Sequence, residues 1–197
     1  MKLQTALISV LFAATALPAA APATWTIDAA HSAAQFSVRH MLVSTVRGEF
    51  DGPTGTVTFD PANIAATEVE ASIDARTINT RNPARDKDLK DVDFFNVGKF
   101  PHITFRSHRA EPLSPGHFNL VGDLTMRGVT KEVTLAVEGP SSEIMDLEGN
   151  RRIGANATTT IDRRDFGLLY NELIEGGGAV VSNQVTINLD LEMIRKK

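Results

Sequence analysis

Apolar and polar residues alternate with a period of two along most of the chain. Runs with this period cover residues 34–40, 56–60, 68–75, 102–106, 118–126, 133–137 and 185–192. Turn signals rich in Gly, Pro, Asn and Asp separate these runs. A period of two places successive side chains on opposite faces of a strand. The pattern therefore predicts seven or eight half-buried strands in an antiparallel sheet that folds on itself as a sandwich or a barrel.

The segment Arg81–Phe95 breaks this alternation with four basic and four acidic residues. Asn82 is a good N-cap and Pro83 suits the first helical position, so a short helix is expected from Pro83 to about Asp91. The two phenylalanines that follow are expected to fold back onto the sheet. We interpret the segment as a clasp over one end of the fold, made by Arg85, Asp86, Phe94 and Phe95.

A second irregular segment runs from Asp162 to Gly178. It is expected to contain a turn at Arg164–Gly167 and a short helix from Leu168 to Ile174. The sequence thus predicts two short helical segments, over about residues 82–95 and 165–175.

Residues 1–23 have the features of a secretory signal peptide. Lys2 is followed by an apolar run from Leu7 to Leu17, and Ala21-Pro22-Ala23 resembles a cleavage site of small residues. The apolar run is short for a membrane span. We therefore expect an exported protein whose mature domain covers residues 24–197.

Charge and composition narrow the function classes. Without residues 1–23, 19 basic residues face 24 acidic ones, a net charge of −5. A nucleic-acid binder needs a basic surface that displaces phosphate counterions, so this class is disfavoured. The absence of cysteine excludes disulfides, thiolate catalysis and zinc–thiolate sites.

Candidate catalytic and metal-binding residues carry no recognisable motif. The five histidines, His31, His40, His102, His108 and His117, lack tight metal-ligand spacing, so no metal or other cofactor is expected. Ser32 follows His31 without a nucleophile elbow. No catalytic residue is therefore predicted. If the protein were an enzyme, Asp28, His31 and His40 would be the least implausible set.

Five stretches in order resemble the YceI-like, polyisoprenoid-binding family. "WTIDAAHSAAQFSVRHM" (25–41) is similar to the family's opening strand and turn, and "VRGEFDGPTGTVTFDP" (46–61) to its G-x-F hairpin. "NTRNPARDKDLKDVDFFNVGKFPHITFRS" (79–107) resembles its most recognisable block. "GDLTMRGVTKEVTL" (122–135) and "IDRRDFGLLYNELIEGGGAVVSNQVTI" (161–187) resemble the rest.

The resemblance implies an all-β, eight-stranded, antiparallel lipocalin-like barrel crossed by helical segments. It also implies a periplasmic or secreted protein that tends to form a homodimer. Its partner would be a long-chain lipid of the isoprenoid, isoprenoid quinone or fatty amide class, held in an apolar tunnel. Asp88 stands where the family usually has His, so no head-group contact is carried over.

The alternating faces alone fit a packed core as well as a tunnel. Small residues on these faces, Ala34, Ala71, Ala75, Gly122 and Ala157, leave volume unfilled, and together with the resemblance they favour a tunnel. We expect a non-catalytic carrier, store or scavenger. The alternatives are an enzyme acting on such a lipid and a ligand-free, stress-related structural protein. The predicted tunnel lining is Phe36, Val38, His40, Val57, Phe59, Val69, Ile73, Phe105, Leu120, Leu124, Val133, Leu135, Ile187 and Leu189.

Overall fold

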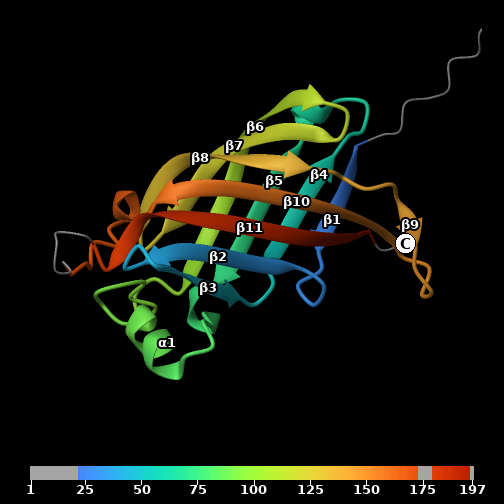
Figure 1. Cartoon of the computed structure of the whole chain (residues 1–197). Helices are drawn as coiled ribbons and strands as arrows, with labels where there is room; N and C mark the ends of the chain where they lie inside the picture. Colours follow the sequence, from blue (N-terminus) through green and yellow to red (C-terminus); the bar gives the residue numbers. More distant parts are fainter. Residues whose placement is uncertain (1–21, 173–178, 196–197) are drawn as a thin grey trace, which may run out of the picture.

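The structure is a computed structural model that describes residues 22–172 and 179–195. Strands dominate it, with one α-helix and three short 3₁₀ helices (Figure 1). The strands are β1 Ala23–Ile27, β2 Ala33–His40, β3 Ser44–Phe50, β4 Thr54–Phe59, β5 Glu68–Asp74, β6 His102–Ser114, β7 His117–Met126, β8 Val129–Glu138, β9 Ile144–Met145, β10 Arg151–Asp162 and β11 Val181–Arg195. The helices are η1 Ile64–Ala66, η2 Ala75–Thr77, α1 Pro83–Lys90 and η3 Arg163–Phe166.

Eight of the strands form a closed antiparallel barrel, which confirms the predicted fold class. Their order around the ring is β11-β1-β4-β5-β6-β7-β8-β10, and the pairing of β10 with β11 closes it. This closing ladder runs from Arg151 opposite Arg195 to Asp162 opposite Gln184. Closure pairs both edges of most of these strands, which leaves few free backbone groups.

The β2–β3 hairpin extends the sheet beside the barrel. β11 pairs with β2 along its first part and with β1 only at Met193 and Ile194. β3 therefore forms an outer edge, bridged to the rest of the chain at Glu49 and Asn79. Figure 1 shows α1 below β3. Leu89 of α1 and Phe94 and Phe95 of the following turn line the barrel cavity at this end.

The inward faces of the strands form an apolar interior because the sequence alternates. Phe118, Leu120 and Leu135 form one buried cluster with other side chains of β6, β8 and β10. Trp25 and Met193 belong to a second cluster near the strand ends of β1 and β11. A third cluster surrounds Phe166, which is 1% exposed, at the end covered by the helices.

The predicted helical segment 82–95 is only partly helical. The side chain of Asn82 caps α1 by accepting a hydrogen bond from the Arg85 N–H, as expected. The helix ends at Lys90, however, and residues 91–95 form turns. The turn brings the Phe95 N–H to the Leu89 carbonyl at 3.0 Å, and this geometry directs the two phenylalanines toward the barrel.

The predicted helical segment 165–175 is wrong for residues 167–172, which contain no helix. Gly167 adopts a left-handed conformation (φ 73°) and ends η3, because its N–H bonds back to the carbonyls of Arg163 and Arg164. The rest of the segment, residues 173–175, lies outside the described residues, as does the expected signal peptide up to residue 21.

Every predicted alternating run lies in a strand, except that Asp60 follows the end of β4 and Ala75 belongs to η2. β5 thus ends one residue earlier than its pattern. The alternation did not identify β1, β3, β9 or β10. β1 begins at Ala23, the last residue of the expected signal, which pairs with Phe59. Within residues 22–172 and 179–195, no helix is long and apolar enough to span a bilayer.

Candidate functional site

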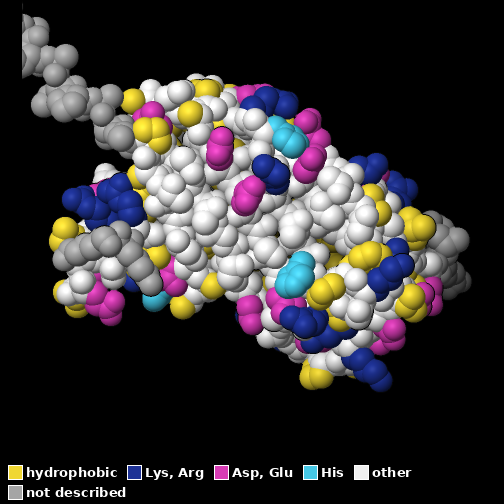
Figure 2. All heavy atoms as spheres, turned by 180° about the vertical axis from the view of Figure 1, so that it is seen from behind, with side chains coloured by type: hydrophobic (Ala, Val, Ile, Leu, Met, Phe, Trp, Pro, Cys, Tyr) yellow, Lys and Arg dark blue, Asp and Glu magenta, His cyan; other side chains and the backbone are white. Residues whose placement is uncertain are grey.

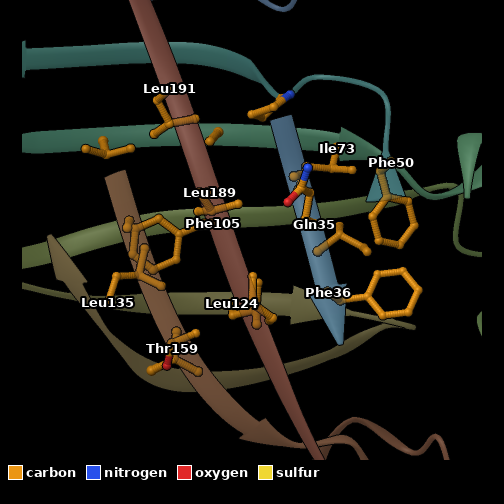
Figure 3. A pocket seen from close by; sticks show the side chains of 18 of the residues that line it. Gln35, Phe36, Phe50, Ile73, Phe105, Leu124, Leu135, Thr159, Leu189 and Leu191 are labelled. Carbon is orange, nitrogen blue, oxygen red and sulfur yellow. The ribbon is translucent and has the colours of Figure 1, made fainter. Parts of the chain in front are cut away.

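The barrel encloses a cavity of about 240 Å³. This is close to the lower end of the range for ligand pockets, roughly 300–1,000 Å³. The space is elongated, because its wall includes β10 from Ile153 to Ile161, about 26 Å along the strand at ~3.3 Å per residue. Figure 3 shows side chains of several strands, among them Phe105, Leu124 and Leu189, pointing into this common space.

The structure places thirteen of the fourteen predicted tunnel residues on the cavity wall. They are Phe36, Val38, Val57, Phe59, Val69, Ile73, Phe105, Leu120, Leu124, Val133, Leu135, Ile187 and Leu189. His40 does not line the cavity. It ends β2 opposite Val181, and of these two paired residues only Val181 lines the cavity. Whether the thirteen side chains contact a ligand stays a prediction.

The small residues differ in what they do. Ala34, Ala71 and Ala157 line the cavity and leave room in it. Gly122 leaves none, because the ring of Phe105 lies over it, with its Cζ 2.7 Å from where a Cβ would stand. Ala75 is buried in η2, away from the wall. The three alanines therefore leave space in the cavity, whereas Gly122 does not.

Almost no polar atom faces the cavity. Five polar residues reach the wall, namely Gln35, Thr67, Thr104, Thr159 and Arg163, but they present chiefly carbon to the space. Arg163 is 5% exposed, and its guanidinium points to backbone carbonyls, including those of Ser182 (3.0 Å) and Leu168. Burial lowers the pKa of this guanidinium. The Thr67 hydroxyl is buried without a hydrogen-bond partner among the described residues.

Aromatic rings close the cavity at the α1 end. Phe36 packs on Phe50 with ring centroids 5.7 Å apart, and Phe50 packs edge-on against Phe95 at 5.8 Å. On the other side of the turn, Phe94 contacts Tyr170 at 4.9 Å. All except Tyr170 line the cavity. The phenylalanines of the predicted clasp thus lie between the cavity and the outside.

The charged half of the clasp binds one threonine. Thr80 is 4% exposed, and its hydroxyl donates to the Asp86 carboxylate (2.5 Å) while accepting from the Arg85 Nε–H (2.7 Å). The Thr80 N–H also donates to Asp86 at 2.8 Å, and its carbonyl accepts from Arg85 at 2.9 Å. Arg85 and Asp86 therefore fasten α1 to the segment that follows η2.

The least implausible catalytic set is not assembled. The His31 ring lies 2.9 Å from the Asp28 carboxylate, but His40 is at the other end of β2. Arg152 bonds to Asp28 (2.8 Å) and to Glu192, and it also bonds to Asp146 (2.7 Å).

The geometry of the cluster around Arg152 is that of an ion-pair network. The Arg152 hydrogen bond holds the pKa of Asp146 at about 2, and hydrogen bonds from His31 and then Arg152 lower the pKa of Asp28. Ligand atoms of Asp28, His31 and Glu192 lie within 4.8 Å of one another, a spacing that a cation could use. The guanidinium already compensates the two carboxylates there.

Two groups of lining residues were missed from the sequence. β10 contributes Ile153, Ala155, Thr159 and Ile161. These residues alternate along the strand, but the small Ala155 and the polar Thr159 make the apolar face hard to tell from the polar face in the sequence. Residues that approach from irregular segments, such as Leu168, carry no periodic signal. A period of two in the sequence predicts which side chains share a strand face. A loop residue has no such pattern, and the tertiary fold alone brings it to the cavity.

Known proteins resemble this chain in sequence or in fold. A UPF0312 protein of Staphylococcus aureus strain N315 is 35% identical over 168 residues, which cover 85% of this chain and 95% of that protein. The crystal structure of Burkholderia cenocepacia BcnA has a TM-score of 0.71 at 22% identity, covering 84% of this chain and 98% of that one.

Two further structures support the fold. The Campylobacter jejuni YCEI protein has a TM-score of 0.68 at 28% identity, over 81% of this chain and 90% of that one. A polyisoprenoid binding domain from Saccharophagus degradans, implicated in plant cell wall breakdown, has a TM-score of 0.62 at 17% identity, over 87% and 98%. Residues 25–193 match the YceI-like domain. With an enclosed apolar barrel and this match over most of its length, the chain belongs to the YceI-like family.

Proposed function

We propose that this protein is a non-catalytic binding protein that holds the hydrocarbon chain of a long amphiphile, of the isoprenoid class, inside its barrel. The observation that carries the proposal is the elongated cavity with an almost wholly apolar wall. Such a wall recognises hydrocarbon by excluding water, and the described residues present almost no polar atom to the cavity.

The energetics favour a long chain over a small polar molecule. Transfer of hydrocarbon out of water contributes about 0.8 kcal/mol per CH₂. A polar group placed in the same space would lose its hydrogen bonds to water without replacement, at a cost of roughly 1–3 kcal/mol. We infer that the chain of the ligand lies in the barrel and that its head group lies at an end of the barrel.

Relatives support the ligand class. The name of the Saccharophagus degradans domain describes that protein as polyisoprenoid binding. An isoprenoid chain is long, branched and apolar, and it suits a wall of branched and aromatic side chains. The signal-like residues 1–23 support export, so we place the protein in the periplasm, where a nearly water-insoluble lipid needs a carrier, store or scavenger.

Native mass spectrometry of the protein purified from its own periplasm tests the proposal. Lipid extraction of the same sample identifies the mass that is lost on denaturation. We expect one co-purifying lipid per barrel. The matched variants are Ala157→Leu, which fills the cavity from β10, and Ala136→Leu, whose side chain is exposed on β8. Ala157→Leu should reduce loading severalfold, whereas Ala136→Leu should load like the parent protein.

Two results would contradict the proposal. One is a protein that stays ligand-free after purification and also takes up no isoprenoid alcohol added in detergent. The other is equal loading of the Ala157→Leu and Ala136→Leu variants, because the ligand would then lie outside the barrel. Circular dichroism spectra of both variants establish that each is folded.

A further inference from the structure

The turn between β2 and β3 presents three apolar side chains to solvent. Met41, Leu42 and Val43 are 41%, 66% and 80% exposed. We call these three residues the hairpin tip. Single exposed apolar residues are common, but three in succession at the end of a hairpin are not explained by the core.

The backbone of the hairpin tip is strained. Met41 and Leu42 have φ values of 50° and 61°, and the Val43 N–H donates to the His40 carbonyl at 3.2 Å. Two consecutive positive φ values are typical of a type I′ turn, which favours Asn-Gly. Non-glycine residues rarely adopt this conformation, because it strains their backbone. The chain therefore holds apolar side chains outward at a position where a polar pair would be more stable.

The hairpin tip lies at the end of the barrel where the cavity wall ends. The Met41 N–H donates to the Val180 carbonyl at 2.8 Å, and the next residue, Val181, lines the cavity. A further exposed apolar side chain lies in the neighbouring segment. Asn171 exchanges two hydrogen bonds with the backbone of Val181, and Leu169, two residues before Asn171, is 67% exposed. In Figure 2, hydrophobic, basic and acidic side chains are intermixed at the end where α1 lies.

The charged residues of the hairpin itself near its tip are positive, whereas Glu172 lies in the adjoining segment, where its carbonyl accepts from the Val180 N–H at 2.9 Å. Residues 39–47 contain Arg39 and Arg47 and no Asp or Glu. Arg39 donates to the Leu42 carbonyl (2.7 Å) and to Thr45 (3.0 Å), and no ion pair joins Arg39 or Arg47 to a carboxylate in the described parts of the chain. At the opposite end of the barrel, Arg152 is bound by three carboxylates.

We propose that the hairpin tip docks on a lipid bilayer that contains anionic phospholipids. The three apolar side chains would enter the boundary between head groups and acyl chains, and the two arginines would contact phosphates, as interfacial segments do. This inference rests on the proposed function, because docking would place the α1 end of the cavity against the membrane that supplies or receives the lipid.

Flotation of the purified protein with vesicles tests the docking. One set of vesicles contains phosphatidylglycerol and phosphatidylcholine, and the other contains phosphatidylcholine alone. The variants are Leu42→Ser, with Leu113→Ser as its control at another hairpin (64% exposed), and Arg47→Gln, with Arg106→Gln as its control. Circular dichroism establishes that each variant is folded.

We expect binding to the phosphatidylglycerol vesicles that falls with added salt. Leu42→Ser should weaken it roughly tenfold, since one apolar side chain leaves the interface. Arg47→Gln should weaken it about fivefold, the effect of one basic residue near an anionic surface. The two control variants should bind like the parent protein.

Three outcomes would overturn the inference. They are no binding to either vesicle, an equal loss for Leu113→Ser and Leu42→Ser, and a dimer in solution that Leu42→Ser dissociates without any vesicle binding. The last result would assign the hairpin tip to a second copy of the chain. Lipid loading measured on the same samples separates the two proposals, because a protein that binds vesicles but loads no lipid contradicts the proposed function alone.

Discussion

The ring of Phe95 meets the ring of Phe50 edge-on, with centroids 5.8 Å apart and planes at 88°. This contact joins the turn after α1 to the end of β3, two segments that are far apart in the sequence. Both rings line the cavity, so the contact is part of its wall and part of its closure at the same time. Edge-to-face aromatic pairs contribute about 0.5–1.5 kcal/mol beyond their buried area.

Phe95→Ala should open this end of the barrel. We expect a loss of about 3 kcal/mol in the free energy of unfolding, measured by urea titration, because a large side chain leaves a packed site. The bound lipid should also dissociate faster. Val92→Ala is the control in the same turn, since Val92 is 57% exposed and should change stability little. Unchanged stability and lipid release in Phe95→Ala would contradict a closing role for this ring.

Arg85→Ala should loosen α1. It removes two hydrogen bonds to Thr80 and leaves that buried residue partly unsatisfied, which costs about 1–3 kcal/mol. Thermal unfolding and lipid retention measure the effect. Lys87→Ala, at an exposed position on the same helix, should stay within about 0.5 kcal/mol of the parent protein. If Arg85→Ala keeps full stability and full loading, the clasp is not a structural element.

Acid should destabilise the protein through depressed carboxyl pKa values. The pKa values of Asp74, Asp146 and Asp162 are lowered to about 2, in each case chiefly by an arginine. A carboxylate with a lowered folded-state pKa stabilises the fold above its unfolded pKa, and this stability is lost as the pH falls through the folded value. The melting temperature should therefore fall between about pH 4 and pH 2.

Arg152→Gln tests the largest of these networks. The variant should be less stable than the parent at neutral pH, and it should lose less melting temperature between about pH 4 and pH 2, because Asp146 and Asp28 then titrate nearer their ordinary values. Arg106→Gln is the control, since Arg106 and its partner Glu70 are 75% and 65% exposed. Parallel pH profiles for Arg152→Gln and the parent would show that this network does not carry the acid sensitivity.

Gly122→Ala should destabilise the barrel by about 1–3 kcal/mol or more, the usual cost of overpacking. A Cβ there would meet the Arg106 carbonyl oxygen, the Ser107 Cα at 2.7 Å and the ring of Phe105, and the backbone atoms of β6 cannot move aside. Chemical denaturation measures the loss. Gly98→Ala, with no neighbour within 4 Å, should be nearly neutral. Equal stability of the two variants would mean that β6 and β7 can separate at this position.

The clasp shows how far local sequence reaches. Asn82 and Pro83 mark the start of α1, because capping and a fixed φ act within one turn of the chain. The helix was expected to end at about Asp91 and ends at Lys90. The rest of the segment expected to be helical, up to residue 95, forms turns, from which Phe94 and Phe95 pack against distant residues. The chemistry of Arg85 and Asp86 was expected to fasten the helix, but their shared partner Thr80 could not be read from spacing.

The alternation of apolar and polar residues by itself determined the class of the fold and thirteen of the side chains on the cavity wall. A strand exposes alternate residues to opposite faces whatever its neighbours are, so thirteen inward side chains could be named from their period. The tertiary structure decided which strand closes the ring, that β10 belongs to it, and that His40 does not line the cavity. These depend on pairing register and on contacts between segments far apart in the chain, which no local period encodes.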